Sequence, residues 1–296
     1  MEYIPATGAL ASAFDIRTFS APAKAFAVQK GGTRYTPEQI QHQRKVGICT
    51  AISLTQNAHA STGIKFSADF QYLIQKKFYD EGTVIGWNEG SSIFHALKAA
   101  KGIGLLPEEH FTQWITEADR NLPYAQYIAK LKAIPETEIA KLILIANKYK
   151  IKAYASVKVD RDSMAEAIYN SKAGVLTRYT LGNEWWTDVN GNVTWDKTKL
   201  EPLRPAAQWL SGHAVTDSNF DGNSFRIANT WSKDWADNGT AYRLHNQTAP
   251  TEAWQLWYWD EELPKPIEEQ VESRSSIIGK IMNLLQQVIA LLAKLA

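Results

Sequence analysis

The sequence predicts an α+β fold with two lobes, a helical N-terminal lobe and an antiparallel β C-terminal lobe, followed by an amphipathic C-terminal helix. Residues 43–150 have the pattern of helices, whereas residues 151–260 have the pattern of short strands separated by turns. Helices and strands in separate blocks of a chain are typical of an α+β protein. The 296 residues are enough for two modest lobes, and 45% hydrophobic with 21% charged residues is ordinary for a globular protein.

Glycine and proline mark the irregular parts of the chain. The first 42 residues predict an irregular segment, because Gly31–Gly32 and Pro37 interrupt any regular pattern. Further on, Ile139–Tyr149 predicts a helix within the first block. In the second block, Asn190–Gly191 and Asp221–Gly222 predict tight turns between strands.

Three features of the β block bear on function. Asn190–Gly191 joins two tryptophan-containing runs, which we interpret as a packing insertion in preference to a flap that grips substrate. Ser211–Val215 predicts a turn that enters a short apolar strand. Phe225–Ala228 alternates weakly in hydrophobicity and predicts a half-buried strand that ends at Asn229.

The single cysteine, Cys49, is predicted to stand at the N-terminus of a helix. Gly47 lets the backbone turn tightly just before it, and the residues from Thr50 onward can continue as a helix. At that position the helix dipole and the first N–H groups favour the thiolate over the thiol. A lone cysteine is more often an inert buried residue than a nucleophile, so this feature alone assigns no chemistry.

A histidine and an asparagine downstream supply what a reactive thiol needs. Two neighbouring strands would bring His213 and Asn229 side by side. The asparagine oxygen accepts from one ring nitrogen, which leaves the other nitrogen to face sulfur. Trp231 would cover that contact and keep water away.

These residues, together with Gln43, resemble the papain-like cysteine peptidases. The family order is glutamine, cysteine, histidine and asparagine, and Gln43 stands six residues before Cys49, as it does in the family. Asn229–Leu244 resembles the family run of Asn-Ser-Trp-Gly, a second Trp-Gly and Asn-Gly-Tyr. The resemblance spans roughly residues 12–260.

The resemblance implies a cysteine endopeptidase that hydrolyses peptide bonds without a metal or another cofactor. It implies a Cys49 nucleophile paired, as thiolate and imidazolium, with His213 as general acid and base. It also implies that Asn229 orients the imidazole and that the Gln43 amide donates to the oxyanion.

The implied substrate-binding residues are Gly90, Ser91 and Trp231. The first two lie in Glu89–Glu109, which is similar to the family's glycine-rich substrate loop and the helix that follows it. A peptide or protein is the substrate that this resemblance implies.

Two departures from the family pattern are visible. Ile48 stands where the family usually has serine or alanine, and Thr50 replaces an aromatic residue, so the rim of the oxyanion site is expected to differ. The 164 residues between the cysteine and the histidine exceed the family spacing. We expect two insertions, near residues 121–147 and 183–209, neither of which touches the matched residues.

Two other functions stay open at this point. One is a catalytically idle papain-like module that binds or supports a partner, and the other is an amidase or acyl transferase, because the same thiol chemistry serves any amide. The net charge of +1 gives no reason to expect a nucleic-acid partner. One cysteine excludes an internal disulfide, whereas secreted papain-like enzymes normally have several, and no secretory leader is recognised, so a cytoplasmic, reducing location is expected. The family's inhibitory propeptide is not recognised either.

The end of the chain is predicted to be separate from the peptidase domain at residues 1–260. Residues 261–276 form a polar linker that contains prolines, and residues 277–296 form a helix with a wide apolar face. That face is expected to dock on the parent domain, to self-associate or bind a partner helix, or to lie weakly on a membrane surface.

Overall fold

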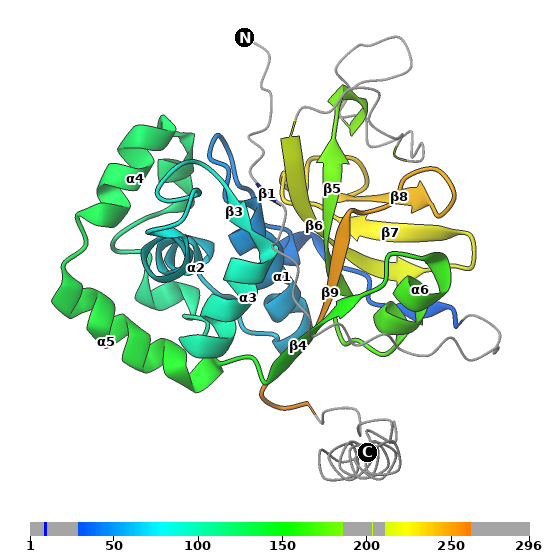
Figure 1. The fold of residues 1–296 in the computed structure, drawn as a ribbon, viewed down its shortest axis with the longest axis horizontal. Helices are drawn as coiled ribbons and strands as arrows, with labels where there is room; N and C mark the ends of the chain where they lie inside the picture. Colours follow the sequence, from blue (N-terminus) through cyan, green and yellow to red (C-terminus); the bar gives the residue numbers. More distant parts are fainter. Residues whose placement is uncertain (1–8, 11–28, 186–202, 204–210, 262–296) are drawn as a thin grey trace, which may run out of the picture. The chain divides into compact units, whose positions relative to one another are not determined.

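The computed structural model describes residues 9–10, 29–185, 203 and 211–261 (Figure 1). Within these ranges the α-helices are α1 Cys49–Thr62, α2 Ala68–Gln75, α3 Ile93–Gly102, α4 Tyr124–Lys132, α5 Glu136–Ala146 and α6 Arg161–Tyr169. The strands are β1 Ala9–Leu10, β2 Gly31–Gly32, β3 Ser91–Ser92, β4 Ala153–Val157, β5 Val175–Leu181, β6 Ser211–Phe220, β7 Ser224–Ala228, β8 Thr240–Leu244 and β9 Glu252–Trp257. Short 3-10 segments are η1 Pro37–Gln39, η3 Glu108–His110, η4 Glu117–Asn121, η5 Asn147–Tyr149 and η6 Asn183–Trp185, and η2 Lys76–Asp80 is a π-helix.

The order of these elements confirms the predicted α+β architecture. Helices α1–α5 form one lobe, and β4–β9 form an antiparallel sheet on which α6 packs (Figure 1). The predicted helix at Ile139–Tyr149 is α5 continued by η5, so it begins three residues earlier than expected. The first residue of α5 follows Pro135, whose fixed φ suits the start of a helix.

Helix α1 joins the two lobes. It contacts α2 and α3 of the helical lobe and β6 of the sheet (Figure 1). Because partners cover both of its sides, residues Cys49–Ala58 are all buried and no polar face is left. Its buried Gln56 and Asn57 donate to the backbone carbonyls of Ala228 and Ala173, at 3.2 Å each, which ties the helix to the β lobe.

The sheet follows the order β4-β9-β5-β6-β7-β8, with β2 paired to β6, and all of its pairs are antiparallel. Strands β6 and β7 form a hairpin whose turn contains the predicted Asp221–Gly222. The Asp221 carboxylate accepts from the backbone N–H groups of Asn223 and Ser224 at 2.8 and 2.7 Å, which stabilises the turn. The predicted strand at Phe225–Ala228 is β7 and begins one residue earlier.

A buried apolar cluster lies between the lobes. It joins Cys49 and Ile93, at the starts of α1 and α3, to Leu176 of β5, Ala214 of β6 and Trp254 of β9. Separate clusters fill the helical lobe and the β lobe. The cysteine therefore stands where the two lobes meet.

Several predictions fall outside the described residues. These are the hairpin at Asn190–Gly191, almost all of the linker at 261–276, and the helix at 277–296. Among the residues that are described, no helix is long and apolar enough to span a membrane.

Candidate active site

Cys49 is the first residue of α1, as the sequence predicts. No side chain caps this end of the helix, so the helix dipole acts directly at the cysteine. The Cys49 side chain has no exposed surface and belongs to the apolar cluster between the lobes. The helix N-terminus favours the thiolate, whereas the apolar surroundings favour the thiol.

Strands β6 and β7 bring His213 and Asn229 together. His213 Nε2 lies 2.8 Å from Asn229 Oδ1, and a carbonyl oxygen only accepts, so Nε2 carries the hydrogen of this bond. The backbone N–H of Thr230 donates to the same oxygen at 2.7 Å, which fixes the orientation of the amide. His213 Nδ1 is buried and has no hydrogen-bond partner in the described part of the chain.

The environment of His213 favours a neutral ring. Its side chain is fully buried, and this burial lowers its pKa from the ordinary 6.5 to about 4, while the hydrogen bond that it donates to Asn229 opposes that fall. Burial therefore disfavours the imidazolium form of His213 that the resemblance to papain-like peptidases implies. In the neutral ring that donates through Nε2, Nδ1 holds the lone pair and is the nitrogen that accepts a proton.

Aromatic side chains enclose the imidazole. The Trp231 ring is stacked on the His213 ring, with centroids 4.7 Å apart and an interplanar angle of 27°. The edge of Trp185 approaches the same imidazole at 5.9 Å and 86°. Trp235 Nε1 donates to the Trp185 carbonyl at 3.2 Å, which holds Trp185 in this position. Trp231 thus covers the histidine as predicted, and Trp185 adds a second wall.

Gln43 is attached to the segment that carries Asn229. Its backbone N–H donates to the Thr230 carbonyl at 2.9 Å, and a bridge between His42 and Trp231 continues this pairing. The Thr230 hydroxyl donates to Gln43 Oε1 at 2.6 Å. Because the amide oxygen is held by this bond, the amide NH₂ is the end of the side chain that donates elsewhere.

Sequence reasoning missed an arginine that clamps the segment around Gln43. Arg120 donates through Nε and Nη2 to the Asp69 carboxylate, at 3.0 and 2.8 Å, and through Nη1 to the His42 carbonyl at 2.8 Å. The backbone N–H of Lys45 donates to the Arg120 carbonyl at 3.0 Å. Arg120 therefore holds the backbone on both sides of Gln43.

The expectation that neither insertion touches the matched residues is wrong. Tyr127, inside the first predicted insertion, donates to the Asp69 carboxylate at 2.8 Å. Trp185, inside the second, contacts the rings of His213 and Trp231. Trp185 therefore contacts a candidate site residue directly, whereas Tyr127 is connected to the segment around Gln43 through Asp69 and Arg120.

Gly90 and Ser91 lie at a strand edge that is already paired. Strand β3, which begins at Ser91, pairs in parallel with Ala9–Leu10 of β1, and β1 also contacts β6. Part of the N-terminal segment lies on the edge that the resemblance assigns to substrate.

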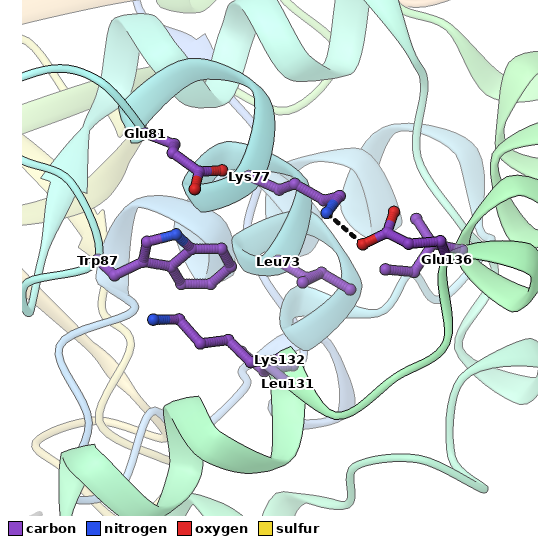
Figure 2. A pocket seen from close by; sticks show the side chains of 8 residues that line it. Leu73, Lys77, Glu81, Trp87, Leu131, Lys132 and Glu136 are labelled. Carbon is purple, nitrogen blue, oxygen red and sulfur yellow. Dashed lines mark hydrogen bonds and ion pairs between the residues drawn. The ribbon is translucent and has the colours of Figure 1, made fainter.

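A hollow of about 300 Å³ lies elsewhere on the helical lobe, between α2, α4 and α5 (Figure 2). Its lining residues are Leu73, Lys77, Glu81, Trp87, Leu131, Lys132, Glu136 and Ile139. Lys132 lies over the Trp87 ring at 4.7 Å, and Lys77 pairs with Glu136 at 2.5 Å. None of the predicted site residues lines this hollow. No cluster of three potential metal ligands occurs in the described ranges.

Solved structures resemble this one at low sequence identity. Xylellain, a cysteine protease from Xylella fastidiosa, aligns with a TM-score of 0.64 at 22% identity over 85% of this chain and 95% of that chain. The proCathepsin B S9 from Trypanosoma congolense aligns with a TM-score of 0.56 at 14% identity over 85% of this chain and 86% of that chain. The chain has a papain-like fold. Protein-family models and curated proteins gave no match.

Within this papain-like fold the candidate residues come from both lobes. The helical side supplies Gln43, Cys49 and the β3 edge, and the sheet side supplies His213 and Asn229. The papain-like arrangement thereby places a thiol at a helix start and an oriented imidazole on the strand that this helix contacts. The residues that hold the helical side, such as Arg120, belong to no recognised motif.

Proposed function

We propose that this protein is a cysteine peptidase that hydrolyses peptide bonds through Cys49. The observation that carries the proposal is the orientation of His213, whose Nε2 donates to Asn229 while Nδ1 has no hydrogen-bond partner among the described residues. A histidine that is fixed in one tautomer and keeps its other nitrogen for proton transfer is what thiol activation requires.

In the proposed reaction, His213 Nδ1 takes the proton of the Cys49 thiol, and the sulfur attacks the carbonyl carbon of the scissile bond. The resulting imidazolium gives its proton to the leaving amine, and a thioester remains on Cys49. Water then attacks the thioester, with His213 again as the base, and the carboxylic acid leaves as sulfur regains its proton.

The oxyanion of each tetrahedral intermediate is held by the Gln43 side-chain NH₂ and the Cys49 backbone N–H. The bond from Thr230 to Gln43 Oε1 supports this role, because it sets which end of the amide donates. A single donor of this kind contributes about 2.7–4 kcal/mol to the stability of the transition state.

A peptide is the substrate class that the β3 edge supports best. That edge already accepts an extended segment of this chain, Ala9–Leu10, through backbone pairing. An extended peptide adds to a strand edge by the same main-chain hydrogen bonds, whatever its side chains.

The test is turnover of a fluorogenic peptide library by the wild-type protein, Cys49→Ala and His213→Gln. Both variants are expected to lose turnover by a factor on the order of 10⁴ or more while keeping the wild-type circular dichroism spectrum. Because Cys49 is the single cysteine, the mass shift after alkylation reports on that residue alone. Peptidase activity that survives in Cys49→Ala would show that the assignment is wrong. A wild-type protein that cleaves nothing, and whose thiol reacts no faster than free cysteine, would indicate the idle binding module instead.

A further inference from the structure

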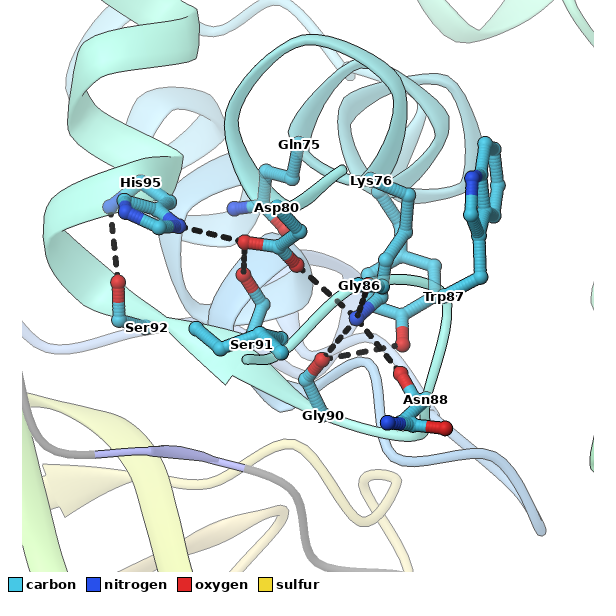
Figure 3. A network of polar contacts seen from close by, with 12 residues as sticks. Gln75, Lys76, Asp80, Gly86, Trp87, Asn88, Gly90, Ser91, Ser92 and His95 are labelled. Atoms are coloured by element: carbon cyan, nitrogen blue, oxygen red, sulfur yellow. Dashed lines mark hydrogen bonds and ion pairs between the residues drawn. The ribbon is translucent and has the colours of Figure 1, made fainter. Parts of the chain in front are cut away.

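The loop that leads into β3 is held from inside by a buried lysine (Figure 3). Lys76 has no exposed surface, and its Nζ donates to the carbonyl of Gly86 at 3.2 Å, to that of Asn88 at 2.6 Å, and to that of Gly90. One ammonium group therefore turns three carbonyls of the loop toward the interior of the helical lobe.

A buried aspartate connects this lysine to β3. Asp80 Oδ2 lies 2.9 Å from Lys76 Nζ, and neither side chain is exposed. Asp80 Oδ1 accepts from the Ser91 hydroxyl at 3.1 Å and lies 2.5 Å from His95 Nδ1 at the start of α3 (Figure 3). The side chain of Ser91 is thus turned inward, while its backbone pairs with β1.

The ion pair of Lys76 with Asp80 depends on an unusual backbone conformation. Lys76–Asp80 is a π-helix that continues α2, and such short π-helical segments occur often at functional sites. A Lys and an Asp four residues apart normally form an exposed pair on a helix surface. Here burial lowers the pKa of Lys76, and the Asp80 carboxylate opposes that fall.

Two more contacts fix the same loop. Tyr124 donates to the carbonyl of Asn88 at 2.8 Å, and the Glu89 carboxylate accepts from the backbone N–H of Gly47 at 2.6 Å. The second contact joins the loop to the residues just before Cys49. The loop is consequently fixed relative to both β3 and the start of α1.

We propose that Lys76 and Asp80 are positioning residues for peptide binding, which hold the loop carbonyls and Ser91 inward so that the β3 edge faces an extended substrate. This inference rests on the proposed peptidase function for the identity of the substrate, and it assigns the ion pair no part in the bond-breaking steps. Without the ammonium group the Gly86 carbonyl loses the donor that the structure gives it, the Asn88 carbonyl keeps only the bond from Tyr124, and the buried Gly90 carbonyl keeps only a 3.4 Å bond from Tyr72. The loop would then recover these hydrogen bonds by turning its carbonyls outward to water.

The experiment separates positioning from mere stability with the double variant Lys76→Met, Asp80→Asn. Removal of one partner leaves a buried, unpaired charge and destabilises the protein, whereas removal of both charges restores neutrality. The double variant is therefore expected to fold, but methionine donates nothing to the three carbonyls. Lys77→Met is the matched control, because Lys77 is the next residue and its ion pair with Glu136 lies at the surface.

The measured quantity is a ratio of two rate constants for alkylation of Cys49. The rate constant with a peptidyl epoxide is divided by the rate constant with iodoacetamide, which has no peptide part. The double variant is expected to lower this ratio at least ten-fold, and to raise KM for peptides ten-fold while kcat changes less than three-fold. Ser91→Ala, a milder change, is expected to lower the ratio about three-fold. Lys77→Met is expected to stay within two-fold of wild type in every measurement.

A ratio that stays within two-fold of wild type in both the double variant and Ser91→Ala would overturn the proposal. So would an equal fall of both rate constants in parallel with the melting temperature, because that result describes a structural role only. The alkylation ratio does not require turnover. A wild-type protein that reacts with the peptidyl epoxide yet cleaves no amide would refute the proposed peptidase function. The alkylation ratios of the variants would still test the positioning role in that case.

Discussion

The helical side and the sheet side of the candidate site are held by different kinds of interaction. On the helical side, charged side chains that are buried reach backbone carbonyls: Lys76 binds the loop before β3, and Arg120 binds the segment around Gln43. On the sheet side, strand pairing and stacked rings place His213 beside Asn229. Buried ion pairs occur in both lobes, since Arg243 of β8 pairs with Asp217 of β6 and donates to the Thr248 carbonyl at 2.9 Å. The difference is that on the helical side buried ions bind the segments next to the candidate site residues, whereas on the sheet side the strand ladder and stacked rings place those residues.

Replacement of Arg120 is expected to have the largest effect on stability. Arg120→Met leaves the Asp69 carboxylate buried without its partner, which costs about 3–5 kcal/mol of unfolding free energy. Urea denaturation measures this loss. Arg44→Met is the control, because the pair of Arg44 with Glu117 is exposed and contributes about 0–1 kcal/mol. Equal losses of unfolding free energy in Arg120→Met and Arg44→Met would show that the buried ion pair contributes no more to stability than the exposed one.

Replacement of Gln43 is expected to affect turnover more than folding. In the proposed mechanism the Gln43 amide donates to the oxyanion, which exists only along the reaction path, so Gln43→Ala is expected to lower kcat by about 10²–10³ while KM changes little. Thr230→Val keeps the amide but removes the bond that orients it, and an intermediate loss of kcat is expected. Steady-state kinetics on one peptide separates the two parameters. An unchanged kcat in Gln43→Ala would mean that another group holds the oxyanion.

Acid is expected to destabilise the sheet side through His213. Its pKa is about 4 in the folded protein against an ordinary 6.5, so between these values the unfolded chain binds a proton that the folded protein excludes. The free energy of unfolding therefore falls as the pH is lowered from 6.5 toward 4, by about 3 kcal/mol from this residue. Burial also lowers the pKa of His42 to about 4, so His42 lowers the free energy of unfolding over the same pH range. The decisive quantity is the difference between wild type and His213→Gln, and parallel pH profiles would contradict the assignment.

Replacement of Asn229 is expected to have the smallest of these effects. Asn229→Ala leaves His213 Nε2 and the backbone N–H of Thr230 without their acceptor, which costs about 1–3 kcal/mol. Thermal unfolding measures the loss, and a double-mutant cycle with His213→Gln isolates the part that belongs to the pair. A larger loss of stability in Asn229→Ala than in Arg120→Met would contradict the expectation that the buried ion pair of the helical side contributes more than this hydrogen bond of the sheet side.

The sheet side was easier to predict from the sequence than the helical side. His213 and Asn229 stand on adjacent strands joined by a two-residue turn signal, so pattern and turn chemistry place them together. Gln43 and Cys49 followed from their spacing in the resemblance. The fold class followed from the separate blocks of helix and strand, which tertiary packing does not change.

The groups that hold the helical side escaped prediction for a physical reason. Arg120 and Asp69 are 51 residues apart, and the further partner of Arg120 is the His42 backbone carbonyl, which leaves no mark in a sequence. Lys76 and Asp80 are only four residues apart, but that spacing normally indicates an exposed helical pair. Their burial depends on a π-helical turn that residue periodicity does not reveal.

The pairing of β1 with β3 changes how affinity for this edge has to be measured. Ala9–Leu10 belongs to the same chain as the β3 edge with which it pairs, so for a peptide that binds this edge it would act as a tethered competitor with an effective concentration on the order of millimolar. A peptide that binds the edge must displace this competitor, and dilution of the protein does not weaken it. Cleavage of the chain anywhere between Leu10 and Gly31 would turn the tethered strand into a free peptide, whose occupancy of the edge would then fall with concentration.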